Sequence, residues 1–264
     1  MNRIDETFKK LKKAKKKAFI AFLTAGYPDL KVTEDLAVAL GNSGADLIEI
    51  GVPFSDPLAD GKTIQAASQK ALEHHVTLEK ILSLVKRIRA RSPVPLALMT
   101  YYNPVFHFGE AKFVAEAKAA GADGVIIPDL PPEEARGLIK AARAKRIATI
   151  FFLAPTTSRH RIKRIADAST GFIYYVSVTG ITGTAQTIQF SQLRKSIRTA
   201  KMMTKKPVCV GFGVSTPAQV KAVAGIADGV IVGSEIIRRI DQNRGKKDLV
   251  KNVARFVRIL TRAL

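Results

Sequence analysis

The stretch PVCVGFGVSTPAQVKAVAGIADGVIVG, residues 207–233, contains the repeating unit that decides the fold. Two apolar runs, at 207–211 and 229–233, flank a segment of helical character at 216–224. Each run is nearly continuous in apolar residues, which is typical of a parallel strand covered on both faces. A strand, a helix and a second parallel strand form a right-handed βαβ unit, and this stretch predicts one such unit.

The same alternation extends through the rest of the chain. The other apolar runs lie at 18–25, 47–51, 95–100, 124–127, 147–153 and 172–177. Helices are expected between them at 32–43, 63–90, 110–120, 132–144, 158–168 and 189–200, and 234–264 is expected to form two more. Eight strand–helix units in 264 residues predict one α/β domain over residues 1–264, a (β/α)8 TIM barrel. Ile4, Phe8 and Leu11 share one helical face, which predicts an additional N-terminal helix.

Composition excludes several classes of protein. The chain is 47% hydrophobic and 25% charged, which indicates a globular rather than a disordered protein. Its only cysteine, Cys209, excludes an intramolecular disulfide and a cysteine zinc cluster, and it favours a reducing, cytoplasmic location. The longest apolar run, 18–25, is too short to span a membrane. Lysines precede it as in a secretory signal, but the barrel needs this run as its first strand.

The net charge of +21 is unevenly distributed. Residues 1–20 carry +6, residues 21–130 carry −3 and residues 131–264 carry +18. A basic second half suits an anionic ligand, although most of the lysine and arginine runs are expected to be solvated surface. No aromatic residues are interleaved with these runs, and no nucleic-acid-binding motif is present. We therefore expect weak, salt-sensitive attraction to polyanions but no specific nucleic-acid partner.

A short glycine-to-aspartate motif precedes three of the predicted strands. It reads Gly44-Ala45-Asp46, Gly121-Ala122-Asp123 and Gly225-Ile226-Ala227-Asp228. Each glycine is expected to be the left-handed residue that ends a helix. The motif indicates repeated structural units and no particular function.

Acidic residues mark a candidate active site after the second strand. Active sites of such barrels lie at the carboxyl ends of the strands. Glu49 alternates with Ile48 and Ile50, so it points into the barrel if these two face the helices. A carboxyl group in that position has a raised pKa and suits general acid–base catalysis. Asp56 and Asp60 are candidates in the following loop, where no histidine supports a metal site.

Glycine-rich turns follow the later strands, at 179–183, 211–216 and 233–235. Backbone N–H groups after strands seven and eight of a barrel commonly hold a phosphate group. No lysine follows these glycines in the spacing of a nucleotide-binding loop, which argues against a nucleoside triphosphate. His107, expected in a loop, and the other histidines add no chemistry.

Six segments together identify a family. They are LIEIGVPFSDPLADG, ALMTYYNPVF, IIPDLPPEE, VSVTGITG, VCVGFGVSTPAQV and ADGVIVGSE, in this order along the chain. Together with AFLTAGYPD near the N-terminus, they resemble the alpha subunit of tryptophan synthase over residues 8–239. The resemblance implies retro-aldol cleavage of indole-3-glycerol phosphate to indole and glyceraldehyde 3-phosphate, a carbon–carbon lyase reaction of tryptophan biosynthesis.

The resemblance also implies the roles of particular residues. Glu49 would be the main acid/base, Asp60 the second catalytic carboxylate, and Tyr174 would stand near the reacting carbons. The indole pocket would be lined by Phe22, Met99, Ile126 and Phe152, and the backbone at Gly183, Phe212, Gly213, Gly233 and Ser234 would hold the phosphate.

The family further implies a partner protein. Alpha subunits bind a beta subunit that depends on pyridoxal phosphate, in an α2β2 heterotetramer, whereas this chain needs no cofactor of its own. Residues 53–60 and the stretch after Gly183 would be mobile lids.

Three residues depart from the family pattern, and they keep an alternative open. Lys62 and Thr63 stand where proline and valine are usual, and Glu235 replaces an alanine. Lys62 would either pair with Asp60 or face water, and Glu235 is expected to point away from the phosphate. The alternative is a catalytically weakened subunit that regulates a beta partner. A Schiff-base aldolase is disfavoured because no predicted strand contains a lysine.

Overall fold

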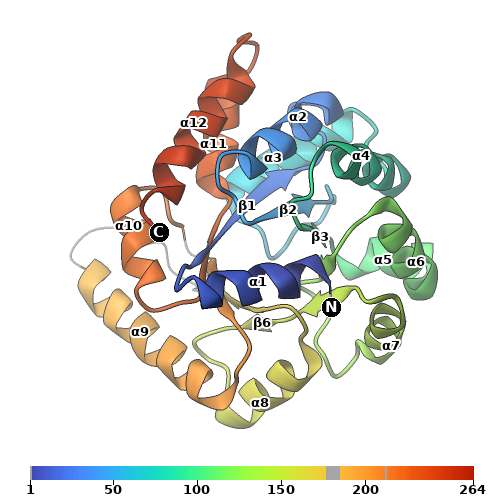
Figure 1. The fold of residues 1–264 in the computed structure, drawn as a ribbon. Coiled ribbons are helices and arrows are strands. Elements are labelled where there is room, and N and C mark those ends of the chain that lie inside the picture. Colours follow the sequence, from blue (N-terminus) through green and yellow to red (C-terminus); the bar gives the residue numbers. More distant parts are fainter. Residues whose placement is uncertain (1, 177–184, 212) are drawn as a thin grey trace.

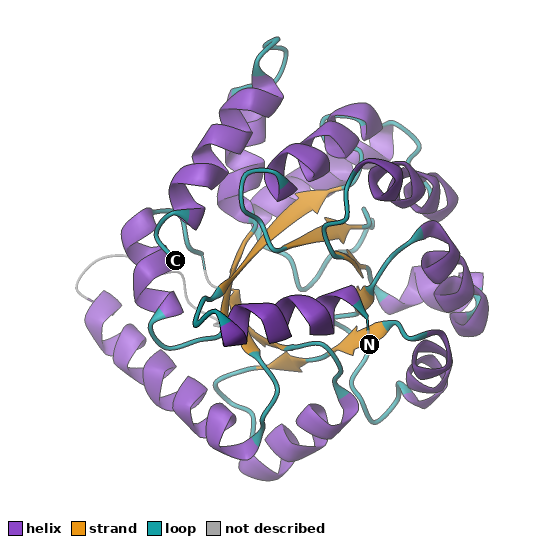
Figure 2. Ribbon diagram, viewed as in Figure 1, coloured by secondary structure: helices purple, strands orange, loops and turns teal. Residues whose placement is uncertain are grey.

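The computed structural model describes residues 2–176, 185–211 and 213–264, without the side chains of residues 185–189. Its strands are β1 (Ala18–Thr24), β2 (Leu47–Gly51), β3 (Leu96–Met99), β4 (Gly124–Ile126), β5 (Ala148–Ile150), β6 (Phe152–Leu153), β7 (Ile173–Val176), β8 (Val208–Gly211) and β9 (Gly229–Val232). Each paired strand runs parallel to its neighbour, in the order β5-β4-β3-β2-β1-β9-β8-β7-β6. Figure 2 shows the strands at the centre and the helices around them.

The predicted run 147–153 supplies both ends of this sheet. β5 pairs with β4 and β6 pairs with β7, and the two segments are separated only by Phe151. The Phe151 carbonyl accepts a hydrogen bond from the Tyr174 backbone N–H at 3.0 Å, so backbone bonding continues across the break. The strands therefore form a nearly closed barrel with eight strand positions, and the predicted TIM barrel is confirmed.

Helices surround the barrel in the predicted alternation. They are α1 (Arg3–Lys13), α2 (Leu30–Gly41), α3 (Lys62–Glu73), α4 (Leu78–Arg91), α5 (Tyr102–Phe108), α6 (Glu110–Ala120), α7 (Arg136–Lys145), α8 (Arg159–Ala168), α9 (Ala185–Met203), α10 (Pro217–Ala224), α11 (Ser234–Gln242) and α12 (Leu249–Thr261). Figure 1 shows α1 across the barrel opening and the other helices around the strands.

Two helical predictions were wrong. The single helix expected at 63–90 is α3 and α4, because His75 adopts a left-handed conformation and Thr77 caps a new helix by accepting from the Lys80 N–H. α5 was expected to be a loop, and it contains His107. Pro104 lies in the first turn of α5, where its missing N–H costs no hydrogen bond, and seven residues are too few to show a helical period.

α1, the additional helix predicted from its amphipathic pattern, closes the amino-terminal end of the barrel. Ile4 is 0% exposed and Phe8 is 8% exposed, and both pack with residues of the barrel interior. The rings of Phe8 and Phe172 lie 5.6 Å apart. α1 crosses the barrel opening in Figure 1, so substrate access is left to the opposite end.

The glycine-to-aspartate motif orders the amino-terminal ends of the strands. Asp46, Asp123 and Asp228 each accept a hydrogen bond from the first residues of a neighbouring strand, at 2.8 to 3.0 Å. Gly44 and Gly121 have φ angles of +101° and +99°, which confirms the expected left-handed conformation. The prediction for Gly225 was wrong, because its φ is −66° and Ile226 and Ala227 lengthen the turn before Asp228.

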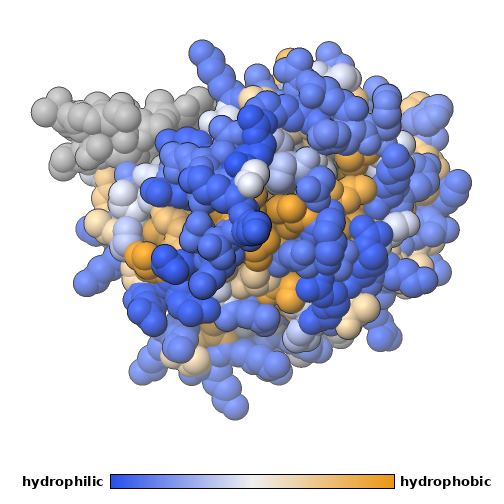
Figure 3. All heavy atoms as spheres, turned by 90° about the horizontal axis from the view of Figure 1, so that it is seen from above, coloured by the Kyte–Doolittle hydropathy of each residue, from blue (hydrophilic) through white to orange (hydrophobic). Residues whose placement is uncertain are grey.

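The face of the molecule in Figure 3 is dominated by hydrophilic residues. Figure 3 shows one face on which hydrophilic residues surround small hydrophobic patches. Within the described ranges, no helix combines the length and the apolar character that crossing a membrane requires.

Candidate active site at the carboxyl ends of the strands

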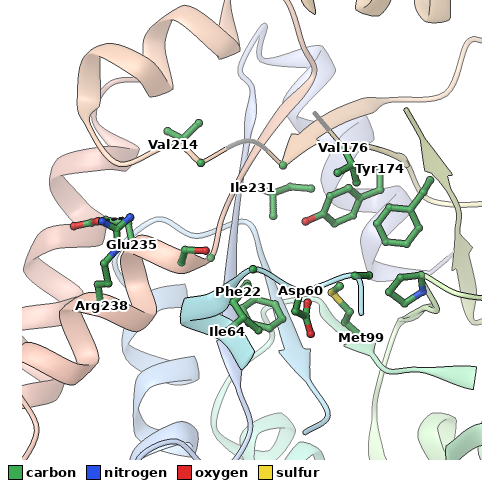
Figure 4. Close-up of a pocket in the computed structure, with 18 residues that line it drawn as sticks. Phe22, Asp60, Ile64, Met99, Tyr174, Val176, Val214, Ile231, Glu235 and Arg238 are labelled. Carbon is green, nitrogen blue, oxygen red and sulfur yellow. Dashed lines mark ion pairs between the residues drawn. The ribbon is translucent and has the colours of Figure 1, made fainter. Parts of the chain in front are cut away.

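A cavity of about 360 Å³ opens where the strands end at the carboxyl end of the barrel (Figure 4). Its lining combines residues from the strand ends and from the loops that follow them. The predicted catalytic, indole-pocket and phosphate residues that line it are Phe22, Asp60, Met99, Phe152, Tyr174, Gly213, Gly233 and Ser234, and Glu235 lines it as well. The fold thus gathers side chains and turns that lie more than 200 positions apart in the sequence.

Glu49 lies inside the barrel beside this cavity rather than in its wall. It pairs in register with Phe22 of β1 and Ala97 of β3. Ile48 and Ile50 pack with the helix-side cluster, as the alternation requires if Glu49 points inward. Glu49 is 0% exposed, and neither carboxyl oxygen has a hydrogen-bond partner among the residues that the structure describes. Burial raises its pKa from 4.5 to about 8.

Asp60 supplies a second carboxyl group at the end of the loop after β2. Burial raises its pKa to about 6, and a hydrogen bond from the Tyr101 hydroxyl opposes that rise. The same hydroxyl accepts the Ala59 N–H at 2.9 Å, and the Tyr101 ring stacks on Phe54 at 5.2 Å. Tyr101 therefore fixes the loop that carries Asp60.

Sequence reasoning missed Tyr101. It follows the apolar run 95–100 directly, and this place at a strand end was the available signal.

Tyr174 lies near both carboxyl groups. Its pKa is raised well above its ordinary value, first by burial and then by the charges of Glu49 and Asp60. The ring lies 4.7 Å from that of Phe152. A Cβ at Gly211 would lie 2.5 Å from Tyr174 Cε1, so only glycine lets the ring lie there. A Cβ at Gly51 would meet Phe22 at the same distance.

One end of the cavity is built from glycine turns. Gly233 precedes α11, whose first turn begins at Ser234, and Gly213 has a φ of +43°. The first N–H groups of a helix lack intrahelical acceptors, so this end offers donors to an anion. Gly183, Phe212 and the stretch after Gly183 lie outside the described residues.

The remaining predicted residues are distributed as follows. Ile126 is 0% exposed in the interior cluster and is not among the described residues that line the cavity. Asp56 is exposed and accepts from the Ser55 hydroxyl at 2.6 Å. Lys62 is exposed, and no ion pair joins it to Asp60 in the part of the chain that the structure describes.

Glu235 is 8% exposed and lies at the cavity edge, where its carboxylate binds two arginines. Arg238 Nη2 lies 3.1 Å from Oε2, and Arg239 Nε donates to Oε1 at 2.9 Å. Figure 4 shows the Glu235 and Arg238 side chains next to each other. Arg238 was also missed from the sequence, although its i, i+3 spacing from Glu235 in a predicted helix was a usable signal.

No group of three or more histidine, cysteine, aspartate or glutamate side chains in the described ranges could hold a metal ion. The cavity instead places two carboxyl groups with separated pKa values beside apolar rings and a donor-rich turn. Fold and site thus define a (β/α)8-barrel enzyme equipped for acid–base chemistry on a ligand with an apolar and an anionic end.

Comparison with known proteins identifies the family. A family model described as tryptophan synthase alpha chain matches residues 8–264. The tryptophan synthase alpha chain of Geotalea daltonii is 51% identical over 247 residues, which are 94% of this chain and 93% of the relative. The structure of tryptophan synthase subunit alpha from Legionella pneumophila has a TM-score of 0.92 at 38% identity and covers 100% of this chain and 98% of its own. For tryptophan synthase from M. tuberculosis in an open form the TM-score is 0.90, at 32% identity, with 100% and 98% covered.

The chain belongs to the tryptophan synthase alpha chain family. It is a carbon–carbon lyase of tryptophan biosynthesis that cleaves indole-3-glycerol phosphate.

Proposed function

We propose that Glu49 is the acid and base of the cleavage reaction and that Asp60 stabilises the charge that develops on the indole ring. The observation that carries this assignment is the Glu49 carboxyl group, which is 0% exposed and unpartnered among the described residues. Its pKa of about 8 keeps it protonated at neutral pH, whereas Asp60, with a pKa of about 6, is mostly ionised there.

The reaction then needs one proton donor and one proton acceptor in sequence. Protonated Glu49 donates its proton to C3 of the indole ring, and positive charge develops near the ring N–H. Ionised Asp60 accepts a hydrogen bond from that N–H and stabilises the transition state more than the ground state. The Glu49 carboxylate next removes the proton of the hydroxyl on C3′. The C3–C3′ bond breaks, its electron pair restores the indole, and the aldehyde leaves.

The rest of the cavity would bind the two ends of the substrate. Phe22, Met99 and Phe152 offer apolar surface to the indole ring, and Tyr174 lies near both carboxyl groups. Gly213, Gly233 and Ser234 also line the cavity and would hold the phosphate through backbone N–H groups. Ile126 would support the ring pocket from within the barrel.

The assignment also includes a partner protein. We infer that a pyridoxal-phosphate-dependent beta subunit binds this chain in an α2β2 assembly and that the chain itself holds no cofactor. Leu58, in the loop that carries Asp60, is 93% exposed, which suits a loop that a partner covers. We place the enzyme in the cytoplasm, where its buried Cys209 would stay reduced.

Indole release from indole-3-glycerol phosphate tests the assignment. The purified chain is compared with Glu49→Gln and Asp60→Asn, each with and without a beta subunit. We expect Glu49→Gln to lower kcat by about 10²- to 10⁴-fold. Full turnover by Glu49→Gln would overturn the acid/base assignment.

A further inference from the structure

The cavity carries an unusual balance of charge for a site that must bind phosphate. A phosphate monoester has a charge of about −1.5 to −2 at neutral pH. Asp60 and Glu235 both line the cavity, and Glu49 lies beneath it. Arg238 is the only cationic side chain among the described residues of the lining.

Glu235 is held from two sides at the phosphate end. Arg239 bonds to one of its oxygens at 2.9 Å and stacks over the Phe256 ring at 4.6 Å, which fixes Arg239 against α12. Arg238 pairs with the other oxygen at 3.1 Å. The pair of arginines outweighs the single carboxylate, so this cluster adds one positive charge to the cavity edge.

The geometry of α11 directs Arg238 towards the glycine turn. Side chains of a helix lean towards its N-terminus, and Arg238 lies just over one turn after Gly233. The Arg238 side chain is 53% exposed, so it keeps room to move. Arg238 pairs with Glu235 through Nη2, and a guanidinium group has five N–H donors in a planar fork that matches phosphate.

We propose that Arg238 binds the phosphate group of the substrate and sets the preference for phosphorylated ligands, while Glu235 positions its guanidinium group. This inference rests on the function proposed above and adds a side-chain cation to the backbone phosphate site. Glu235, which would repel phosphate on its own, becomes part of the binding site through Arg238.

Binding of glycerol 3-phosphate and of inorganic phosphate, measured by calorimetry, tests the proposal without catalysis. We expect Arg238→Gln to weaken glycerol 3-phosphate binding by about 10- to 100-fold, since charged hydrogen bonds are lost. The KM for indole-3-glycerol phosphate should rise by a similar factor with little change in kcat. Arg255→Gln, which removes the same charge from an exposed position on α12, should leave both values unchanged.

A double variant distinguishes direct contact between Arg238 and the phosphate from neutralisation of the Glu235 charge. In Glu235→Gln, the further change Arg238→Gln should still weaken glycerol 3-phosphate binding by about 10-fold or more. If the loss disappears in this background, Arg238 only neutralises Glu235 and the proposal is wrong. If the unmodified chain binds glycerol 3-phosphate no better than glycerol, both the phosphate site and the function proposed above fail. Thermal unfolding of each variant checks that it is folded.

Discussion

Two buried carboxyl groups at opposite ends of the barrel have opposite surroundings. Asp123, at the amino-terminal end, is 1% exposed and accepts from the Leu96 N–H at 3.0 Å, from Arg3 at 3.0 Å and from Arg89 at 2.8 Å. Glu49, at the carboxyl end, is 0% exposed and has no partner in the described ranges. A paired buried charge ties segments together, whereas an unpaired one costs stability and has a pKa suited to proton transfer.

The largest effect is expected at Glu49. Glu49→Gln removes the transferable proton but keeps the shape, so kcat should fall by about 10²- to 10⁴-fold, and the unfolding temperature should not fall. Indole release and thermal unfolding measure the two effects on one preparation. A large loss of stability would show that Glu49 has a structural role like that of Asp123.

The opposite result is expected at Asp123. Asp123→Ala leaves the partly buried Arg89, 14% exposed, without its carboxylate partner, and the free energy of unfolding should fall by about 3–5 kcal/mol. Turnover per folded molecule should stay the same, because the site lies at the other end of the barrel. Urea unfolding and active-site titration measure the two quantities. Unchanged stability would contradict the structural role of the Arg3–Asp123–Arg89 cluster.

The pH dependence of stability should distinguish the unpaired carboxyl group. The pKa of Glu49 is about 8 in the folded chain and near 4.5 when unfolded. Because the folded value is raised, stability is complete below pH 4.5 and is lost as pH rises towards 8. The slope from this one proton approaches about 1.4 kcal/mol per pH unit. Glu49→Gln should remove that slope, and urea unfolding at several pH values measures it. Equal slopes in both proteins would exclude the raised pKa.

The sequence predicts features that arise within one segment better than contacts between segments that are far apart along the chain. The eight strands were predicted because each is a local, nearly continuous apolar run, and alternation alone oriented Glu49 between Ile48 and Ile50. Two helical predictions were wrong because the helical period reveals neither the left-handed residue His75, which separates α3 from α4, nor a helix as short as α5.

Contacts between different loops could not be predicted from the sequence. The bond between Tyr101 and Asp60 joins the ends of two different strand–loop units, and no pattern within either segment indicates their distance. The sequence also did not show how deep a side chain lies within the barrel. Alternation places Ile126 inside but does not say that it lies in the interior cluster rather than in the cavity wall.

Tyr101 offers a smaller test of the catalytic end. The rate, as kcat/KM, should rise as Asp60 ionises near pH 6 and fall as Glu49 ionises near pH 8. Tyr101→Phe removes the hydrogen bond that lowers the pKa of Asp60. The acidic limb of the pH–rate profile should therefore move to higher pH. The rate near pH 6 should fall by up to about 10-fold, with a smaller loss near pH 7.5. A pH–rate profile measures this, and an unmoved acidic limb would show that Tyr101 does not act on Asp60.

The smallest effect is expected at Lys62, which stands two positions from Asp60 but is exposed. The causes that set the Asp60 pKa are burial and Tyr101, and Lys62 is not among them. Lys62 opens α3, whose N-cap, Gly61, makes no side-chain hydrogen bond, and a positive charge at a helix N-terminus is unfavourable. Lys62→Gln should therefore leave the acidic limb in place and raise the free energy of unfolding by about 0.3–1 kcal/mol. A limb shifted to higher pH would instead mean that Lys62 pairs with Asp60 during catalysis, and this departure from the family pattern would then tune the rate.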